Sequence, residues 1–341
     1  MELFRILETA FNAIAPIVLL MALGYQLRHK GLFNQSFLEL GNKLVFRLFL
    51  PSLLFANVYD IEGFASIPWD IVIYAIAIAL ALCLAGMGIG FALTKIPERR
   101  GVIAQAVFRA NMAIVGLPLA STLGGREATA VASVISAFII ALFNILAVIV
   151  LTVFLDGGEG RKIHPGKILK DIATNPPVIG ILLGFGCMLL RSLQAKLWGA
   201  PVFTIRDNLP FLYTTVSHLR SLLSPFALLI LGGQFSFSAI GNMRKELVTG
   251  TLCRLILAPL VGLSVAVFLD AKGIIHCGAT EFPALIALLG SPVAVGSETM
   301  AGQMGNDMQL ATQLVVWSSV FSIFTLFLTV CIMMLLGFIP L

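Results

Sequence analysis

Long apolar runs alternate with short polar segments along the whole chain. A helix that crosses a membrane needs about 20 predominantly apolar residues, and ten runs of this kind can be distinguished. No polar interval between them is long enough for a soluble domain. The pattern therefore predicts an all-α polytopic membrane protein with ten transmembrane helices. Their predicted centres are Leu19, Leu50, Ala79, Ile114, Ile140, Leu183, Leu228, Leu257, Leu289 and Phe324.

The composition supports a membrane protein and excludes several other classes. Apolar residues make up 59% of the 341 residues and charged residues 11%, about half the charged share of a soluble domain. The net charge is +5, and the basic residues are scattered, so nucleic acid is not an expected partner. No CxxC pair, HExxH, GxSxG or Walker loop occurs. We therefore expect no enzyme activity, no cofactor and no metal, and transport that is secondary or passive.

Basic residues in the polar segments predict the orientation in the membrane. Arg28, His29 and Lys30 follow the first apolar run, whereas a cleaved signal peptide has its positive charges before the run. Lys and Arg are about twice as frequent on the side that contains segment 156–170. That side is the cytoplasmic one by the positive-inside rule. Both termini are therefore expected on the outer face of a cell inner (plasma) membrane.

The second half of the chain repeats landmarks of the first half in the same order. Each half contains five predicted spans, and an odd number means that the second copy enters the membrane from the opposite face. We therefore expect two inverted five-helix repeats, residues 1–155 and 171–341, joined by a cytoplasmic linker at 156–170. Such repeats are typical of secondary transporters with alternating access. The matched landmarks are Pro16 to Gly24 with Pro176 to Gly184, Pro51 with Pro225, Gly116-Leu117-Pro118 with Gly290-Ser291-Pro292, and Ala128-Thr129 with Ala311-Thr312.

Gly and Pro residues in the middle of spans four and nine predict broken helices. Gly116 and Pro118 lie near the centre of span four, while Ser291 suits an N-cap with Pro292 at the first helical position of span nine. A simple proline kink is the alternative for either span alone. Corresponding breaks in the two halves would direct two helix N-termini to one place. Their free amides and positive dipole ends favour an anion there, most simply a carboxylate.

Three polar residues near these breaks are candidates for direct roles. Asn111 precedes Pro118 by about two turns, so its amide suits a carboxylate, carbonyl groups freed by the break, or both. Arg109 is a charged residue at a membrane depth where a charge is energetically unfavourable. Its side chain could bind a second carboxylate of the substrate, pair with an acidic residue, or snorkel to the end of the span. Glu298 is the coupling candidate, as a proton carrier, a cation ligand or the partner of an arginine. A solvated vestibule is the alternative surrounding for Glu298.

Four further polar residues lie in or at the edge of apolar runs. Arg254 has no obvious partner in the sequence. Asn144 is deep enough to form a hydrogen bond across helices. Arg47 and Arg220 are expected to anchor their helices at the membrane interface.

Six segments spread over nearly the whole chain carry a family resemblance. They are IAPIVLLMALGYQLR from Ile14, NKLVFRLFLPSLLFANV from Asn42, NMAIVGLPLA from Asn111, NPPVIGILLG from Asn175, SPFALLILGGQF from Ser224 and SPVAVGSETMAGQMGND from Ser291. These segments resemble the auxin efflux carrier family, which unites plant PIN-FORMED auxin exporters with bacterial malonate- and malate-transporter-like proteins. The Asn-x4-Gly-Leu-Pro string from Asn111 is the most specific element. The short central segment resembles that of the bacterial members.

The resemblance implies that the helices form two parts with different roles. Spans one, two, six and seven would form a scaffold, and spans three to five and eight to ten a moving transport domain. Asn111, Pro118 and Pro292 would lie at the crossing of the broken helices four and nine. An elevator-like motion and a homodimer are implied in the same way.

The expected function is secondary active transport of small organic anions, with malonate or malate as candidates. The coupling ion is expected to be a proton, with sodium as the alternative, and membrane lipids are further partners. The other functions considered are a sodium-coupled bile-acid-type carrier, an anion channel, and a membrane sensor that binds its ligand without moving it. Glu298 is the expected coupling residue. The expected substrate-binding residues are Arg109, Asn111, Gly116, Pro118, Ser291 and Pro292.

Overall fold

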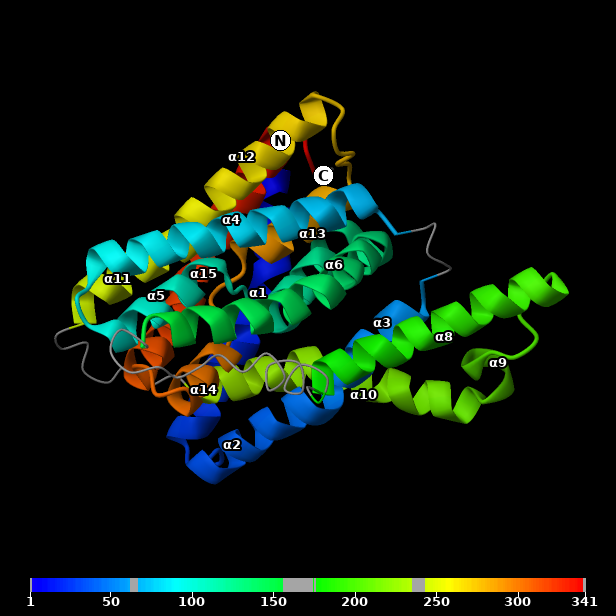
Figure 1. Cartoon of the computed structure of the whole chain (residues 1–341), viewed down its shortest axis with the longest axis horizontal. Coiled ribbons are helices and arrows are strands. Elements are labelled where there is room, and N and C mark those ends of the chain that lie inside the picture. The colour runs from blue at the N-terminus through cyan, green and yellow to red at the C-terminus, as the bar shows by residue number, and fades with distance from the viewer. Residues whose placement is uncertain (1, 62–66, 156–173, 175, 235–242, 340–341) are drawn as a thin grey trace.

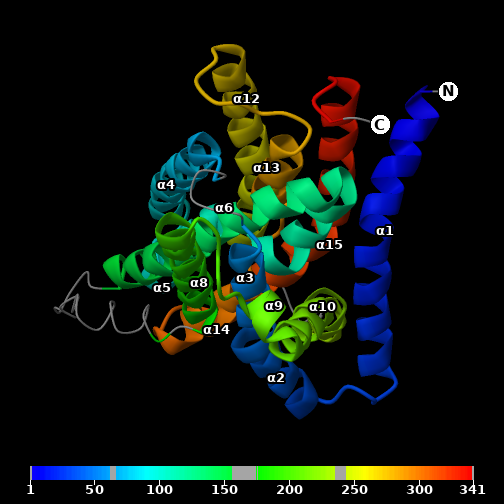
Figure 2. The same ribbon diagram turned by 90° about the vertical axis from the view of Figure 1, so that its right-hand side faces the viewer.

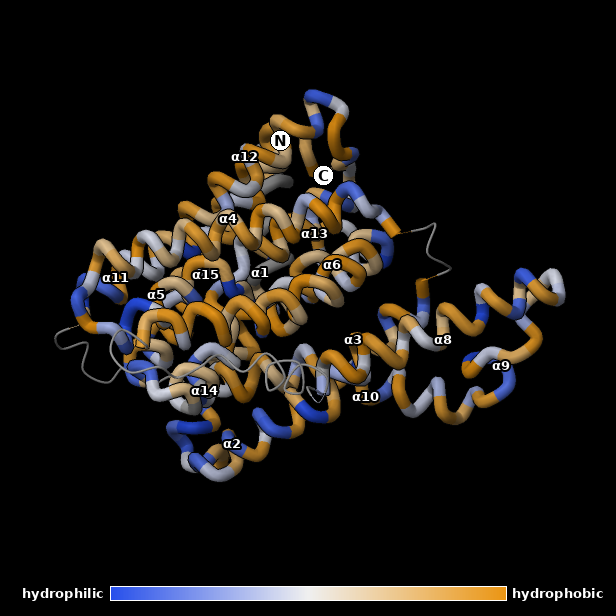
Figure 3. Tube along the Cα trace, viewed as in Figure 1, coloured by the Kyte–Doolittle hydropathy of each residue, from blue (hydrophilic) through white to orange (hydrophobic). Residues whose placement is uncertain are grey.

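The described part of the chain folds into helices and their connections (Figure 1). The computed structural model describes residues 2–61, 67–155, 174, 176–234 and 243–339, so the whole predicted linker at 156–170 lies outside the described residues. Most residues along the helices are hydrophobic, and hydrophilic residues gather at helix ends and connections (Figure 3). Leu84 and Phe91 are 70% and 65% exposed. Such outward-facing apolar side chains suit a protein that is surrounded by lipid.

The helices of the two halves follow one another in similar order. The first half contains α1 (Glu2–His29), α2 (Gln35–Leu44), the π-helical turn η1 (Val45–Phe49), α3 (Leu50–Tyr59), α4 (Trp69–Leu93), α5 (Pro97–Phe108), the π-helical turn η3 (Met112–Gly116) and α6 (Leu117–Val153). The second half contains α8 (Pro176–Trp198), α9 (Ile205–Asn208), α10 (Pro210–Gly233), α11 (Arg244–Leu252), the π-helical turn η5 (Cys253–Leu257), α12 (Ala258–Ala271), α13 (Glu281–Gly290), α14 (Gly296–Gln303) and α15 (Met308–Leu335).

All ten predicted centres lie in helical segments. Six segments of the described chain are long and apolar enough to cross a membrane, and α13 is a shorter apolar helix. These findings confirm an all-helical, multi-pass membrane protein, whereas the ten-span repeat topology stays a prediction. The six segments are Trp69–Leu93, Met112–Val153, Val178–Trp198, Pro210–Gly233, Arg244–Ala271 and Met308–Leu335.

One of these segments is too long for a single crossing. Met112–Val153 has 42 residues, which would span about 63 Å as a straight helix, twice the thickness of a bilayer core. The backbone leaves the helical region at Gly124 and Gly125, and Gly125 has φ 61°. A positive φ of this kind favours glycine. The polar GGRE segment therefore divides α6 into two arms, in agreement with the sequence pattern.

The helices pack in two groups. One group consists of α1, α2, α3, α8 and α10, and the other of α4, α5, α6 and α11 to α15. Contacts of α1 with α15 and of α3 with α6 join the groups. The start of α1 and the end of α15 lie at the same end of the molecule (Figure 2).

Glycines set the closest helix contacts of the first group, and these contacts are exchanged between the halves. A Cβ atom on Gly24 of α1 would overlap the carbonyl group of Leu229 in α10, and one on Gly184 of α8 would lie 3.0 Å from the carbonyl oxygen of Phe55 in α3. Small residues allow membrane helices to approach this closely. The first span of each half thus packs on the second span of the other half. Gly24 and Gly184 are matched positions of the predicted repeat.

Candidate functional site

Two helices break in the second packing group, and the breaks meet. α5 ends at Phe108 and α13 ends at Gly290. Between them and the next helices the chain forms an isolated antiparallel bridge that joins Ala110 to Val293. The amide of Asn111 donates to the carbonyl oxygen of Pro292 at 2.8 Å. The bridge thus joins two helix interruptions from opposite halves of the chain.

The break in the first half lies earlier than the sequence predicted. The backbone is extended at Arg109, and Asn111 is the N-cap of η3. Gly116 and Pro118, which were expected to mark the break, lie within continuous helix. A Cβ atom on Gly116 would lie 2.7 Å from the carbonyl oxygen of Ala287. Gly116 therefore allows close packing of η3 on α13.

Proline fails to break this helix because a π-helical turn precedes it. Pro118 is the second residue of α6, and α6 directly follows η3. Pro51 after η1 and Pro259 after η5 occupy the same position. A wider turn changes the hydrogen-bond register, and a residue without an N–H group fits where the α register resumes. Three prolines of the described chain thus directly succeed the first residue after a π-helical turn, whereas Pro16 and Pro225 lie inside α1 and α10 without such a turn.

The break in the second half also differs from the prediction. Ser291 is the C-cap of α13 rather than an N-cap, and its hydroxyl donates to the carbonyl oxygen of Ala287 at 2.5 Å. Pro292 is buried in the extended segment and is not the first helical residue. The next helix, α14, begins at Gly296. The two prolines therefore have different places: Pro118 follows its break, whereas Pro292 lies within its own.

Two buried donors at the crossing lack a partner. Asn111 is 4% exposed and its Nδ2 has no hydrogen-bond partner. Ser297, the second residue of α14, is 2% exposed and its Oγ is also unpartnered. A buried polar group without a partner costs about 1–3 kcal/mol. Each donor lies at the N-terminal side of a helix that follows a break. At the start of α14 the amides of Ser297 and Glu298 donate to the carbonyl oxygens of Ala294 and Val295.

Arg109 is a buried cation beside these donors. It is 7% exposed and donates to Gln105 Oε1 at 2.9 Å, to Asn144 Oδ1 at 2.7 Å and to Met300 Sδ at 2.9 Å. All three partners are neutral, and none of the ion pairs found among the described residues includes Arg109. Arg109 therefore neither snorkels nor pairs with an acid here. The cross-helix hydrogen bond predicted for Asn144 is confirmed.

The guanidinium of Arg109 also lies near the start of α14. A Cβ atom on Gly296 would be 3.6 Å from Nη2 of Arg109. The positive dipole end of a helix and a positive side chain therefore face the same volume. This arrangement favours a bound anion.

Glu298 lies in the first turn of α14 and is partly buried. Its carboxylate forms no ion pair with any residue that the structure describes, so it is not the partner of an arginine here. Its coupling role stays a prediction. Of the two interfacial anchors expected from the sequence, Arg47 is exposed, and Arg220 pairs with Asp60 at 2.9 Å.

Arg254 is a residue of the crossing that the sequence singled out but for which it indicated no partner. It lies in η5 and is 1% exposed. Its guanidinium donates to the carbonyl oxygens of residues at the C-terminal ends of both α5 and α13. These are Val107, Phe108, Leu288, Leu289 and Ser291. A charge in an apolar run indicated a functional or structural partner, but backbone acceptors carry no sequence signal.

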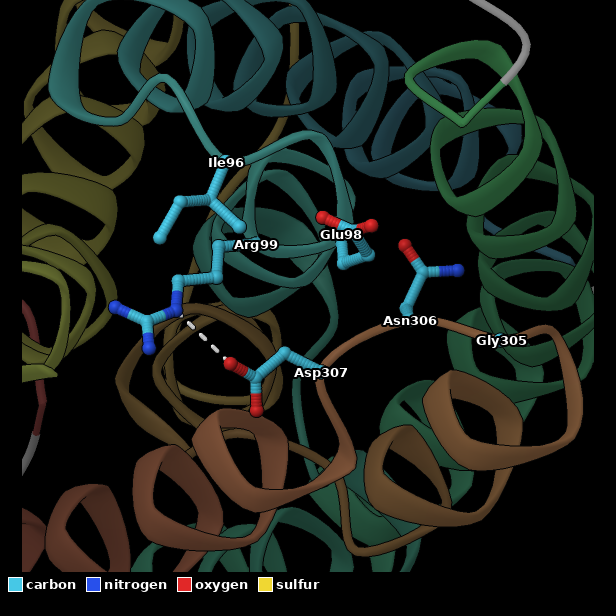
Figure 4. A pocket seen from close by; sticks show the side chains of 6 residues that line it. All are labelled: Ile96, Glu98, Arg99, Gly305, Asn306 and Asp307. Atoms are coloured by element: carbon cyan, nitrogen blue, oxygen red, sulfur yellow. Dashed lines mark hydrogen bonds and ion pairs between the residues drawn. The ribbon is translucent and has the colours of Figure 1, made fainter.

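Two cavities differ in their place relative to the crossing. A cavity of about 280 Å³ lies where α5 and α15 begin, beside Arg99 and Asp307 (Figure 4). Arg99 pairs there with Asp307 at 2.9 Å and with Glu246 at 3.1 Å. Beside Arg254 the space is about 10 Å³, which is enough for about one water molecule. The crossing is therefore closely packed beside Arg254.

The comparison with known families agrees with this architecture. A family model described as membrane transport protein matches residues 9–330. The fold and this match define a multi-pass membrane transport protein, which indicates transport rather than catalysis. The chain belongs to this family, the auxin efflux carrier family, as the sequence segments indicated. It is also similar to an uncharacterized transporter of Methanothermobacter thermautotrophicus, with 21% identity over 324 residues that cover 92% of this chain and 95% of the relative.

Proposed function

We propose that this protein is a secondary active transporter of small organic anions, which bind at the crossing of the two broken helices. The observation that carries the proposal is the unpartnered Nδ2 of Asn111, buried where the two interruptions meet. A carboxylate accepts hydrogen bonds from neutral donors and from helix N-termini. Asn111 and Ser297 each offer one buried, unpartnered donor. The first amides of η3 add further donors.

Arg109 supports a substrate with a second carboxylate. Its three neutral partners orient the guanidinium without cancelling its charge. An arginine binds a carboxylate through two parallel hydrogen bonds. We therefore propose dicarboxylates such as malonate or malate as the favoured substrate class. Pro118, Gly116, Ser291 and Pro292 then act through the backbone: they shape the crossing and do not donate to the ligand.

The proposal includes an elevator-type motion of one packing group against the other. In it, α1, α2, α3, α8 and α10 form a dimeric scaffold, and the remaining helices carry the crossing through the membrane. The close glycine contacts of α1 with α10 support a rigid scaffold. Ten spans in two inverted repeats, with both termini on the outer face of the plasma membrane, complete the topology. The exchanged contacts between the halves support that repeat.

Glu298 is proposed as the coupling residue, with a proton as the coupling ion and sodium as the alternative. Its carboxylate is partly buried, forms no ion pair with a described residue, and belongs to the residue that directly follows Ser297. A carboxylate at such a place can bind and release a proton as its surroundings change between the two faces of the membrane.

Thermal stabilisation of the purified protein tests the binding proposal. A ligand that binds only the folded state raises the melting temperature. We expect dicarboxylates to stabilise the protein more than monocarboxylates, and counterflow of the same compounds in liposomes. Stabilisation without counterflow would indicate a sensor, and flux far above the turnover of a carrier would indicate a channel. The absence of both stabilisation and counterflow would contradict the organic-anion proposal.

A further inference from the structure

The C-terminal sides of the two breaks meet around one side chain. Arg254 donates from Nε to Ser291, from Nη1 to Val107 and Phe108, and from Nη2 to Leu288 and Leu289. All its acceptors are backbone carbonyl oxygens of α5, α13 or the residue that caps α13. The side chain is 1% exposed.

Carbonyl oxygens in this arrangement are suited to a cation. The last carbonyl oxygens of a helix have no intrahelical donor and carry the negative end of the helix dipole. Two such ends converge here in the interior of a membrane protein, where unpaired carbonyl groups are costly. Unwound carbonyl groups and half-helix C-termini are the ligands that broken-helix transporters offer to sodium.

A guanidinium satisfies the same oxygens without a dissociable ion. Arginine stays charged and has five N–H donors, and five carbonyl oxygens surround Arg254. No carboxylate of the described residues pairs with Arg254. The negative ends of the two helix dipoles therefore balance the charge of its guanidinium. The tight packing beside it leaves about 10 Å³.

We propose that Arg254 is a resident cation of the crossing, which occupies the place of a coupling metal ion, so that anion binding at this site needs no sodium. The inference rests on the proposed function for the anion, but its cation part stands on Arg254 alone. Arg254 is thus a positioning residue that joins the C-terminal ends of α5 and α13. Arg109 and Asn111, in contrast, are placed to face the substrate.

Removal of the guanidinium gives a cation-specific test that uses no substrate. Melting temperatures of the full-length protein are measured in choline chloride, in sodium chloride, and in choline chloride with a few millimolar guanidinium. We expect the wild type to melt at the same temperature in all three. Arg254→Ala should melt about 10 °C lower in choline, and guanidinium or sodium should restore several degrees in a saturable manner. Arg220→Ala, which removes an arginine of the Asp60 ion pair, is the matched control and should not respond.

Two results would overturn the inference. One is a sodium-specific stabilisation of the wild type. The other is an Arg254→Ala protein that is destabilised but indifferent to both cations, because a purely structural side chain would behave in that way. If Arg254→Ala does not fold, Arg254→Lys keeps one cation and is expected to fold with a smaller loss and without a sodium response. Sodium-dependent melting of Arg254→Lys or of the wild type would then contradict the proposal, whether or not carboxylates bind.

Discussion

The amide of Asn111 donates a 2.8 Å hydrogen bond to the carbonyl oxygen of Pro292. This bond links the interruption of one half of the chain to that of the other. A return bond from the amide of Ala294 to the carbonyl oxygen of Arg109, at 3.0 Å, completes the antiparallel pairing. The backbone at the crossing is therefore partly satisfied by the partner break, which leaves the side chains of Asn111 and Ser297 free for a ligand.

Asn111→Ala should abolish the stabilisation by carboxylates without lowering the stability of the empty protein. The buried Nδ2 has no partner, so the alanine variant avoids a desolvation cost of about 1–3 kcal/mol. This gain in stability roughly offsets the loss of side-chain packing. Melting curves with and without malonate measure both effects. Asn57→Ala is the matched control, since its Nδ2 is also unpartnered but lies in α3. A malonate response that survives in Asn111→Ala would place the ligand elsewhere.

Arg109→Gln should weaken dicarboxylate binding about 10- to 100-fold and monocarboxylate binding much less. A hydrogen bond to a charged group contributes about 1.5–3 kcal/mol, which corresponds to this change in affinity. Titration calorimetry with malonate and acetate gives the comparison. Arg220→Gln, outside the crossing, is expected to bind both like the wild type. Equal losses for the two ligands would mean that Arg109 shapes the site without binding a second carboxylate.

Glu298→Gln should retain counterflow but lose accumulation that is driven by a pH gradient. Glutamine preserves the shape and hydrogen bonding of the side chain and cannot exchange a proton. Uptake of labelled substrate into liposomes, with and without a pH gradient, separates the two activities. Glu281→Gln, in the first turn of α13, is the control. Unchanged gradient-driven uptake in Glu298→Gln would exclude this residue from proton coupling.

Gly232→Val should destabilise the protein, whereas Gly88→Val should not. A Cβ atom on Gly232 would overlap the carbonyl group of Met21, and one on Gly88 would meet nothing within 4 Å. Overpacking of this kind costs about 1–3 kcal/mol, which corresponds to a melting temperature about 5 °C lower. Thermal melts in detergent provide the measurement. Equal melting temperatures for the two variants would mean that α1 and α10 can move apart without loss of stability.

Sequence patterns predicted the helices well because hydrophobic length is a strong constraint in membranes. They also predicted that spans four and nine are interrupted, and that Asn111 and Arg109 lie near the interruption. The exact breaks were missed for a physical reason: Pro118 is accommodated by a π-helical turn, while the extended residues around Arg109 contain neither Gly nor Pro. The partners of Arg254 could not be predicted, because every one of them is a backbone carbonyl group.

The exchange of helix contacts between the halves has a consequence for biogenesis. Gly24 of α1 meets α10, and Gly184 of α8 meets α3, so the closest packing partner of each opening helix belongs to the other half. When the ribosome has completed the first half, α1 is in the membrane but its partner has not been synthesised. The face of α1 that packs on α10 therefore stays without its helix partner until α10 inserts. Assembly of the scaffold is in this sense a late, post-insertional event, and two halves expressed as separate chains should complement one another only when both are present in the same membrane.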